Sequence, residues 1–317
     1  MMGRRRVPHL ALLVATLTML VSCGRDPIVS VEEAGPQTRP PGVITLGSVS
    51  LNPAAEHDVF RPLADYLGAR LDSVGIGRGR VVVVDSLSTM VNELEAGRVD
   101  FYIDSPFPVG FVVQHSDTKV LLQRFKQGAK VYRSVLFARA DGGIESLADL
   151  RGRVIAFGEP FSTSGYLLPK AALISDGFRL VNYADPGATV PDDEIGYIFS
   201  NDAENTMVWV LKGKVTAGAV NEDYFKALAG SRAGELKILH RSNEVPRNIV
   251  CARGDLDPEV VRAVVGVLLG MNGDVTGQEV LASFEQTSGF GIFPEGGEQA
   301  LAGVIELLPF VEEDLGR

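Results

Sequence analysis

The sequence is poor in the residue types that build metal centres and nucleophilic catalysts. Its 317 residues include two cysteines and four histidines, and none of these stands at metal-ligand spacing with carboxylates. The sequence also has no Gly-x-Ser-x-Gly elbow, and no base lies beside its serine cluster to activate a nucleophile. We therefore expect a protein that is not an enzyme and that uses no cofactor and no metal.

Positive charge and long apolar runs are also scarce. Lys and Arg number 30 against 40 Asp and Glu, and the resulting net charge of −10 argues against a nucleic-acid partner. Beyond the N-terminus, no apolar run approaches the length of a membrane span. The body contains no repeat and no low-complexity segment, and it is long enough for two hydrophobic cores.

The first 23 residues are typical of a lipoprotein targeting segment. Basic residues 4–6 precede an apolar stretch at 10–21, and Leu20-Val21-Ser22-Cys23 resembles the lipobox of bacterial lipoproteins. The resemblance implies that 1–22 is a cleaved signal peptide and that the Cys23 thiol is acylated. The alternative is an ordinary secretory signal with an incidental cysteine. Acylation would leave only Cys251, in a predicted strand, and would exclude an intramolecular disulfide.

Residues 23–42 are rich in Pro, Gly and Glu, and we expect them to form a flexible tether. After them, strand and helix patterns alternate, which is typical of an α/β protein with a mostly parallel sheet. Strands are expected at 43–47, 81–84, 99–103, 119–124, 133–139, 153–158, 216–220, 236–240 and 248–253, and helices at 58–71, 87–94, 146–150, 164–175, 203–213, 222–229, 258–270, 276–284 and 296–308.

Three loops rich in small polar residues and proline follow predicted strands, at 48–52, 104–108 and 159–165. Open parallel sheets bind ligands beyond the carboxyl ends of their strands, so these loops are expected to share one site. The third loop leads into a helix whose N-terminus offers unpaired N–H groups and the positive end of its dipole. Three hydroxyls and a glycine there suit a small oxyanion, although an ordinary Ser/Thr cap is the alternative.

Four motifs, at residues 60–67 (FRPLADYL), 147–152 (LADLRG), 162–166 (STSGY) and 217–220 (AGAV), together resemble the substrate-binding proteins of phosphate/phosphite/phosphonate-type ABC transporters. The resemblance implies a two-lobed periplasmic-binding-protein fold, with two crossing hinge strands and a ligand cleft between the lobes. The first lobe would comprise 43–137 and 248–317, and the second 138–247.

In that family the serine-threonine-serine turn binds the oxyanion of the ligand. The resemblance therefore assigns ligand contacts to Ser162, Thr163 and Ser164, and Gly165 and Tyr166 of the same turn are predicted ligand-binding residues as well.

The sequence departs from the family pattern at three further candidate contacts. Asp104 and Ser105 follow the third strand, where the family often has an aromatic residue and a glycine, and Asn221 stands where an acid is common. In a desolvated cleft Asp104 would repel a phosphonate dianion. It would instead pair with a cationic group on the ligand or with a cleft Arg or Lys, or it would be a solvated loop residue. Lys126 and Lys130 flank a turn and are expected to be solvated.

The sequence thus predicts a substrate-binding lipoprotein of an ABC importer that captures a small phosphonate-, phosphite- or phosphate-like oxyanion by domain closure. Its expected partners are the permease and ATPase subunits and, through the lipid anchor, a membrane. We expect a monomer in the cell envelope, in the periplasm or on the outer face of the cytoplasmic membrane. A lipoprotein that presents a small solute to a membrane receptor kinase would need the same cleft, and a purely structural lipoprotein would need none.

Overall fold

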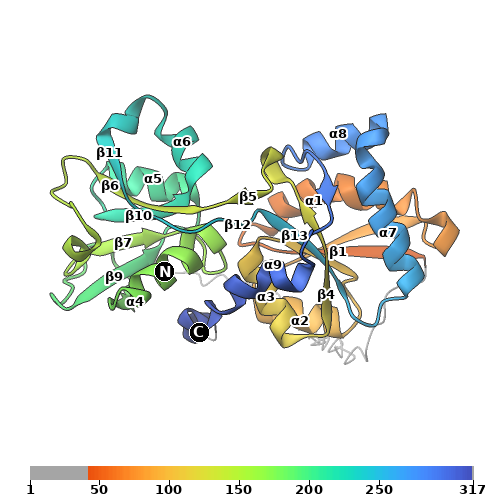
Figure 1. The fold of residues 1–317 in the computed structure, drawn as a ribbon, viewed down its shortest axis with the longest axis horizontal. Helices are drawn as coiled ribbons and strands as arrows, with labels where there is room; N and C mark the ends of the chain where they lie inside the picture. The colour runs from red at the N-terminus through yellow and green to blue at the C-terminus, as the bar shows by residue number, and fades with distance from the viewer. Residues whose placement is uncertain (1–41, 316–317) are drawn as a thin grey trace, which may run out of the picture. The chain divides into compact units, whose positions relative to one another are not determined.

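The computed structural model describes residues 42–315. The predicted signal peptide, Cys23 and all but the last residue of the predicted tether lie outside this range. The described residues form two six-stranded sheets and one two-stranded ribbon, with helices on both faces of each sheet (Figure 1). The predicted α/β class is therefore confirmed.

The first sheet has the strand order β14-β4-β13-β3-β1-β2. Strand β1 pairs in parallel with β2 and β3, whereas β13 runs antiparallel to both of its neighbours, β3 and β4. The strands of this sheet are β1 (Val43–Val49), β2 (Arg78–Val84), β3 (Phe101–Asp104), β4 (Thr118–Arg124), β13 (Asn248–Arg253) and β14 (Phe290–Gly291).

Two apolar layers cover this sheet. Helices α1 (Pro53–Gly68), α7 (Pro258–Gly270) and α8 (Val275–Ser283) bury one face, and α2 (Leu87–Glu95), α3 (Pro106–His115) and α9 (Gly297–Ile305) bury the other (Figure 1). Helix α1 begins five residues before the predicted start because the Asn52 side chain caps it and Pro53 occupies its first turn. Glycine lets α1 lie directly on β2, since a Cβ at Gly79 would come within 1.8 Å of the Ala64 carbonyl oxygen.

The second sheet has the order β11-β6-β10-β7-β9-β8. Helix α4 (Leu168–Ser175) covers one face, and α5 (Ala203–Leu211) and α6 (Glu222–Ala229) cover the other. Strands β8 and β9 are not among the predicted strands, because their run from 179 to 199 is interrupted by Asp, Pro and Gly. The strands are β6 (Ser134–Arg139), β7 (Val154–Phe157), β8 (Arg179–Asn182), β9 (Glu194–Phe199), β10 (Ala217–Asn221) and β11 (Leu236–Arg241).

The ribbon of β5 (Val131–Tyr132) and β12 (Val245–Pro246) carries the chain between the sheets (Figure 1). Strands β6 and β13 follow these two segments directly and are the reversed inner strands of their sheets. The chain therefore passes from the first sheet to the second between Arg124 and Ser134, and it returns between Arg241 and Asn248. The lobe boundaries at 137 and 248 remain a proposal, and β6 itself lies wholly in the second sheet.

Short helical turns complete the fold. A π-helical turn, η4 (Thr163–Leu167), joins β7 to α4, and the chain ends in η7 (Leu308–Phe310) and α10 (Glu312–Leu315). The others are η1 (Asp72–Val74), η2 (Lys126–Gly128), η3 (Leu147–Leu150), η5 (Gly230–Glu235) and η6 (Met271–Gly273). Within residues 42–315 no single helix is long and apolar enough to cross a membrane; Pro258–Gly273 and Val275–Ser283 meet that test only as a pair bent by 96°.

Candidate functional site

A cavity of about 340 Å³ lies where the loops of both sheets meet. All three loops singled out in the sequence contribute to it, and so do the start of β13 and the residues around the ribbon. Its volume suits a small molecule. The residues that line it near the loops include Ser48, Ser50, Asp104, Ser105, Glu159, Ser162 and Ser164, and those near the ribbon include Arg124, Lys126, Tyr132, Arg247 and Asn248.

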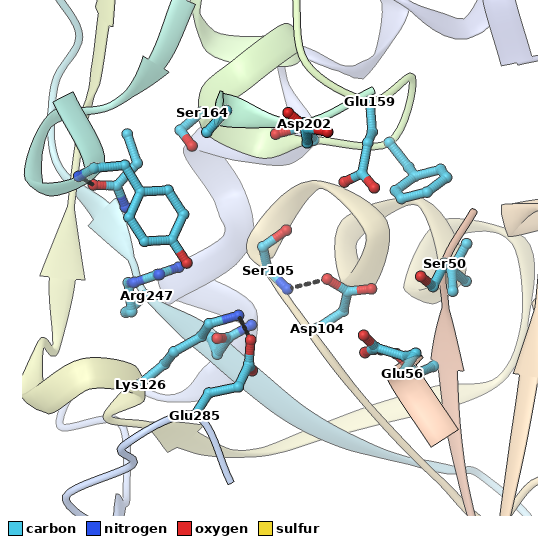
Figure 2. A pocket seen from close by; sticks show the side chains of 18 of the residues that line it. Ser50, Glu56, Asp104, Ser105, Lys126, Glu159, Ser164, Asp202, Arg247 and Glu285 are labelled. Carbon is cyan, nitrogen blue, oxygen red and sulfur yellow. Dashed lines mark hydrogen bonds and ion pairs between the residues drawn. The ribbon is translucent and has the colours of Figure 1, made fainter. Parts of the chain in front are cut away.

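The two serines of the 162–165 turn have different roles: one caps the turn, and the other faces the cavity. The Ser162 hydroxyl accepts a hydrogen bond from the Gly165 backbone N–H at 3.0 Å, so this residue caps the turn. The Ser164 side chain lines the cavity, and among residues 42–315 its hydroxyl has no hydrogen-bond partner. The turn therefore contains both an ordinary cap, at Ser162, and a hydroxyl that is available to a ligand, at Ser164. Figure 2 shows Ser164 at the edge of the cavity.

Thr163 reaches across to the first sheet rather than into the cavity. Its hydroxyl oxygen accepts a hydrogen bond from the Phe107 N–H at 2.9 Å and donates one to the Ser105 hydroxyl at 2.9 Å. Thr163 thus links the turn to the loop after β3. Of this pair, Ser105 lines the cavity and Thr163 does not.

Gly165 and Tyr166 face the protein interior. A Cβ at Gly165 would lie 2.9 Å from the Ser162 hydroxyl oxygen and 3.3 Å from the Cα of Gly158, so a glycine is needed where the turn packs on the end of β7. Gly165 lines only a small adjoining pocket, and Tyr166 is fully buried with its hydroxyl bonded to Asp314. Neither residue lines the main cavity, although the pocket at Gly165 shares Ser162, Ser164 and Asn221 with it.

Three helical N-termini converge on the cavity from the second sheet. Ser162 precedes η4, Asp202 caps α5 and Asn221 caps α6, and all three residues line the cavity. The Asn221 Oδ1 accepts hydrogen bonds from the backbone N–H groups of Asp223 and Tyr224. The positive ends of η4 and α6 favour an anion, whereas at α5 the carboxylates of Asp202 and Glu204, which also line the cavity, oppose one.

Two of the basic side chains at the cavity are already neutralised. Glu285 accepts ion pairs from Arg124 at 3.0 Å and from Lys126 at 2.5 Å. Burial alone would raise the pKa of Glu285, but Lys126 and Arg124 lower it to about 2. The prediction that Lys126 is solvated is wrong: its side chain is 17% exposed, because Glu285 draws it into the cavity wall.

Arg247 is the basic residue that remains. It is 6% exposed, its guanidinium stacks on the Tyr132 ring at 4.6 Å, and it donates one hydrogen bond to the Gln127 side chain at 3.3 Å. Within the described range, no carboxylate forms an ion pair with it. A buried guanidinium without a counter-charge costs free energy unless a ligand supplies one.

Asn248, the next residue, adds a second unsatisfied polar group. Its Oδ1 is buried and has no hydrogen-bond partner among the residues that the structure describes. Since the two ends of an amide are assigned from their hydrogen bonds, this side chain can present either its carbonyl or its NH₂ group to a ligand.

Three carboxyl groups with raised pKa values, those of Glu56, Asp104 and Glu159, lie together at the cavity, and Asp202 lies beside Glu159 (Figure 2). Burial raises the pKa of Asp104 to about 6, against the hydrogen bonds that Ser105 and Tyr102 donate to it. Burial, together with the charges of Asp104 and Glu56, raises the pKa of Glu159 to about 7. Burial also raises the pKa of Glu56, although the Ser48 hydroxyl donates to it at 2.6 Å.

The two sides of the cavity therefore differ in charge. Figure 2 shows Ser164 and Arg247 toward one side and Glu56, Asp104 and Glu159 toward the other. The raised pKa values mean that burial disfavours the ionised form of these carboxyl groups. A cationic group beside them would stabilise that form. An arrangement of this kind can bind an anion at one end and a cation at the other. No group of three or more metal-ligating side chains occurs in the described part of the chain.

The comparisons with known proteins agree with this geometry. The family described as "ABC transporter, phosphonate, periplasmic substrate-binding protein" matches residues 49–293. The phosphate-import protein PhnD of Mycolicibacterium smegmatis is 26% identical over 278 residues, which are 82% of this chain and 79% of that protein.

Solved structures support the fold. XAC2383 from Xanthomonas citri, bound to ATP, superposes with a TM-score of 0.79 at 27% identity and covers 86% of this chain and 98% of its own. PhnD1 from Prochlorococcus marinus, in complex with methylphosphonate, has a TM-score of 0.64 at 17% identity and covers 86% of this chain and 99% of its own. The predicted two-lobed periplasmic-binding-protein fold is confirmed.

Proposed function

This chain belongs to the phosphonate substrate-binding proteins of ABC transporters, and on that premise we propose that its cleft captures a small ligand with a phosphonate- or phosphate-like oxyanion. Proteins of this family work in the cell envelope with permease and ATPase subunits and are transport proteins rather than enzymes. Beyond the family assignment, we propose the class of ligand, the closing motion and the mode of membrane attachment.

The observation that carries the proposal is the buried Arg247 guanidinium, which has no carboxylate partner within residues 42–315. It shares the cavity with the Ser164 hydroxyl and with the N-termini of η4, α5 and α6. An oxyanion placed there would receive charge-assisted hydrogen bonds and would satisfy groups that are otherwise left unpaired. The relatives above 25% identity include a phosphate importer and a protein solved with ATP, and phosphate oxyanions are common to both.

The acidic side of the cavity narrows the ligand class further. A doubly charged phosphonate without a cationic group would face Glu56, Asp104 and Glu159 in a partly desolvated space. An ammonium group on the same ligand would turn that repulsion into attraction. We therefore favour a zwitterionic ligand with its oxyanion toward Arg247 and its cationic group toward Asp104.

Thermal-shift and calorimetric titrations test this function directly. The mature protein is titrated with phosphate, phosphite, methylphosphonate and 2-aminoethylphosphonate. A ligand at 100 times its dissociation constant stabilises the native state by about 2.7 kcal/mol, which is a clear rise in melting temperature. If none of these oxyanions changes the melting temperature or gives heat on titration, the proposed function is wrong.

Closure of the lobes is the second part of the proposal. The β5–β12 ribbon is a narrow connection of two short strands, of the kind at which a few residues absorb a hinge rotation. Solution scattering should therefore show a smaller radius of gyration once a bound ligand saturates the cleft. An unchanged radius at saturation would indicate a rigid pocket.

Attachment through Cys23 is the third part, and it rests on the lipobox-like sequence alone. Acylation would hold the protein at a membrane surface near its permease, and we propose that it acts there as a monomer. Fractionation tests this: Cys23→Ser should move the protein from the membrane fraction to the soluble envelope or culture fraction. The same distribution for wild type and variant would contradict the anchor.

A further inference from the structure

The C-terminal end of the chain carries a buried polar cluster that the proposed function does not use. It consists of Tyr166, Lys170, Tyr197 and Asp314, which we call the Asp314 cluster. The Asp314 carboxylate accepts hydrogen bonds from the Tyr166 hydroxyl and the Lys170 ammonium group, and one from the Tyr197 hydroxyl at 3.0 Å. Lys170 also donates to the Tyr166 hydroxyl at 3.0 Å.

This cluster is well shielded from water. The Lys170 and Asp314 side chains are 8% and 14% exposed, and Tyr166 and Tyr197 are buried. Burial alone would raise the pKa of Asp314, but the hydrogen bonds from Lys170 and Tyr166 lower it below its ordinary value. The carboxylate is therefore held in its charged form, as the counter-charge of a buried lysine.

The cluster joins parts of the chain that are distant in sequence. Tyr166 belongs to η4, the turn that presents Ser164 to the cavity, whereas Asp314 lies in α10. The segment before α10 buries Leu308 and Val311 in the same apolar cluster as Phe107 of α3 and Leu173 of α4. The C-terminal segment thus packs against helices of both lobes and ends on the inner side of the ligand turn.

The turn itself needs such support. It is a π-helical segment of five residues, closed by a bond from the Leu167 N–H to the Ser162 carbonyl at 3.0 Å. A single π turn is a rare conformation, and here it precedes α4 directly. The Tyr166 ring packs against Phe157 and Phe199, with centroids 5.4 Å and 4.9 Å away, and these contacts leave its hydroxyl to be fixed by the cluster.

We propose that Asp314 is a positioning residue for the ligand turn: it holds Tyr166 and Lys170 from behind and so fixes the Ser164 hydroxyl in the cavity. This inference rests on the proposed function only in taking the Ser164 hydroxyl as the oxyanion contact. Because Asp314 reaches the turn from the C-terminal segment of the first lobe, the cluster also couples the placement of that segment to ligand affinity.

The variant Asp314→Asn tests the inference, because it keeps the shape of the side chain and removes its charge. In the protein without ligand, amide hydrogen exchange of residues 162–168 should become about tenfold faster or more, since the local opening free energy falls. Exchange in β1 and β3 should not change. The matched control is Glu312→Gln, which alters an exposed carboxylate in the same short helix and should leave exchange in the turn as it is.

Calorimetry with 2-aminoethylphosphonate and phosphate supplies the second measurement. Asp314→Asn should weaken the binding of both ligands by roughly three- to tenfold, and Tyr166→Phe, which removes one hydroxyl, should weaken it less. If Asp314→Asn is too unstable to study, the double variant Lys170→Met/Asp314→Leu is used, because it replaces both buried charges together. This double variant should be folded, but its turn should still exchange faster than that of wild type.

The outcomes separate the two hypotheses. Unchanged exchange of 162–168 in Asp314→Asn, with or without a lower melting temperature, would overturn the inference and leave Asp314 as a residue that only docks the C-terminus. A different result is also informative. If the turn exchanges faster in Asp314→Asn but even the wild-type protein binds neither ligand, the positioning role is supported and the proposed function is contradicted.

Discussion

Asp104→Asn is the substitution that most directly tests the division of charge in the cavity. Asp104 ends β3, and its carboxylate accepts hydrogen bonds from the Ser105 N–H at 2.6 Å and from the Tyr102 hydroxyl at 2.8 Å. Asparagine has the same shape and keeps one acceptor oxygen for the Ser105 N–H. The substitution therefore removes the charge with little change to the loop that carries it.

The expected magnitude follows from the environment of the carboxylate. Two opposite charges 4 Å apart at an effective dielectric constant of about 20 attract by about 4 kcal/mol, and desolvation of the ammonium group offsets part of this. A net loss of about 1.5–3 kcal/mol corresponds to roughly 10- to 150-fold weaker binding of an aminated ligand. A simple dianion with its charge about 8 Å from Asp104 is repelled by about 4 kcal/mol at the same dielectric constant, and salt and solvent screen part of this. If screening leaves about 1–2 kcal/mol, the variant would bind the dianion roughly 5- to 30-fold more tightly.

The assay uses two ligands that differ only in the amine. Isothermal calorimetry at pH 7.5 compares 2-aminoethylphosphonate with ethylphosphonate on wild type and on Asp104→Asn. Glu204→Gln is the matched control, because Glu204 is an exposed carboxylate at the rim of the same cavity. Its charge is screened by solvent, so we expect less than about a twofold change for either ligand.

Three results are distinguishable. Weaker binding of the aminated ligand together with equal or tighter binding of ethylphosphonate supports an ion pair between Asp104 and the ligand. Equal losses for both would mean that Asp104 only holds the loop in shape. No change for either would refute the reasoning, since the carboxylate would then be remote from the ligand or already neutral.

Three further predictions concern the same cavity. Ser164→Ala should weaken oxyanion binding by roughly 10- to 100-fold with little loss of stability. Ser162→Ala should instead cost about 1 kcal/mol of stability, because it removes a cap. Calorimetry and urea denaturation of both variants separate the two roles. Arg247→Met should abolish oxyanion binding in calorimetry and leave the melting temperature of the unliganded protein equal to or above that of wild type, because an unpaired buried charge is removed. Since the folded-state pKa values of Asp104 and Glu159 are raised to about 6 and about 7, the native state binds more protons than the unfolded chain above pH 4, and its stability should fall as pH rises from about 4 to 7. A tenfold change in a protonation equilibrium corresponds to about 1.4 kcal/mol, and after allowance for solvent screening we expect the free energy of unfolding to fall by about 2 kcal/mol between pH 5 and pH 8. Urea denaturation across this range measures the fall. The double variant Asp104→Asn/Glu159→Gln should lose most of it, and Glu56, whose pKa burial also raises, accounts for the remainder.

Much of the fold could be predicted because its signals are local. The alternation of apolar strands with helices of 3.6-residue period identified the class, and residues from all three predicted loops, at 48–52, 104–108 and 159–165, line one cavity. These segments follow strands of two different sheets, and Pro106–Pro108 of the second segment belongs to α3 and not to a loop. Cys251 is fully buried in β13, as its apolar neighbours predicted. The reversal of β6 and β13 leaves no periodic pattern in the sequence, and only the family resemblance implied two crossing strands near 137 and 248.

The charge pattern of the cavity depends on contacts between residues far apart in sequence, and this is why the site was only partly predicted. Lys126 lies in a turn whose sequence is typical of a solvated loop, and its burial follows from an ion pair with Glu285, a residue 159 positions later. Arg247 and Asn248 stand at the start of a strand, where basic and amide side chains are unremarkable, and they become candidate contacts only because β13 enters its sheet beside the ligand loops. Conversely, Thr163 was predicted as a ligand contact from its motif, yet its hydroxyl is used to join the turn to Ser105 and Phe107. A motif can identify which turn faces a ligand, but which of its hydroxyls remains free depends on the partners that the rest of the fold brings to it.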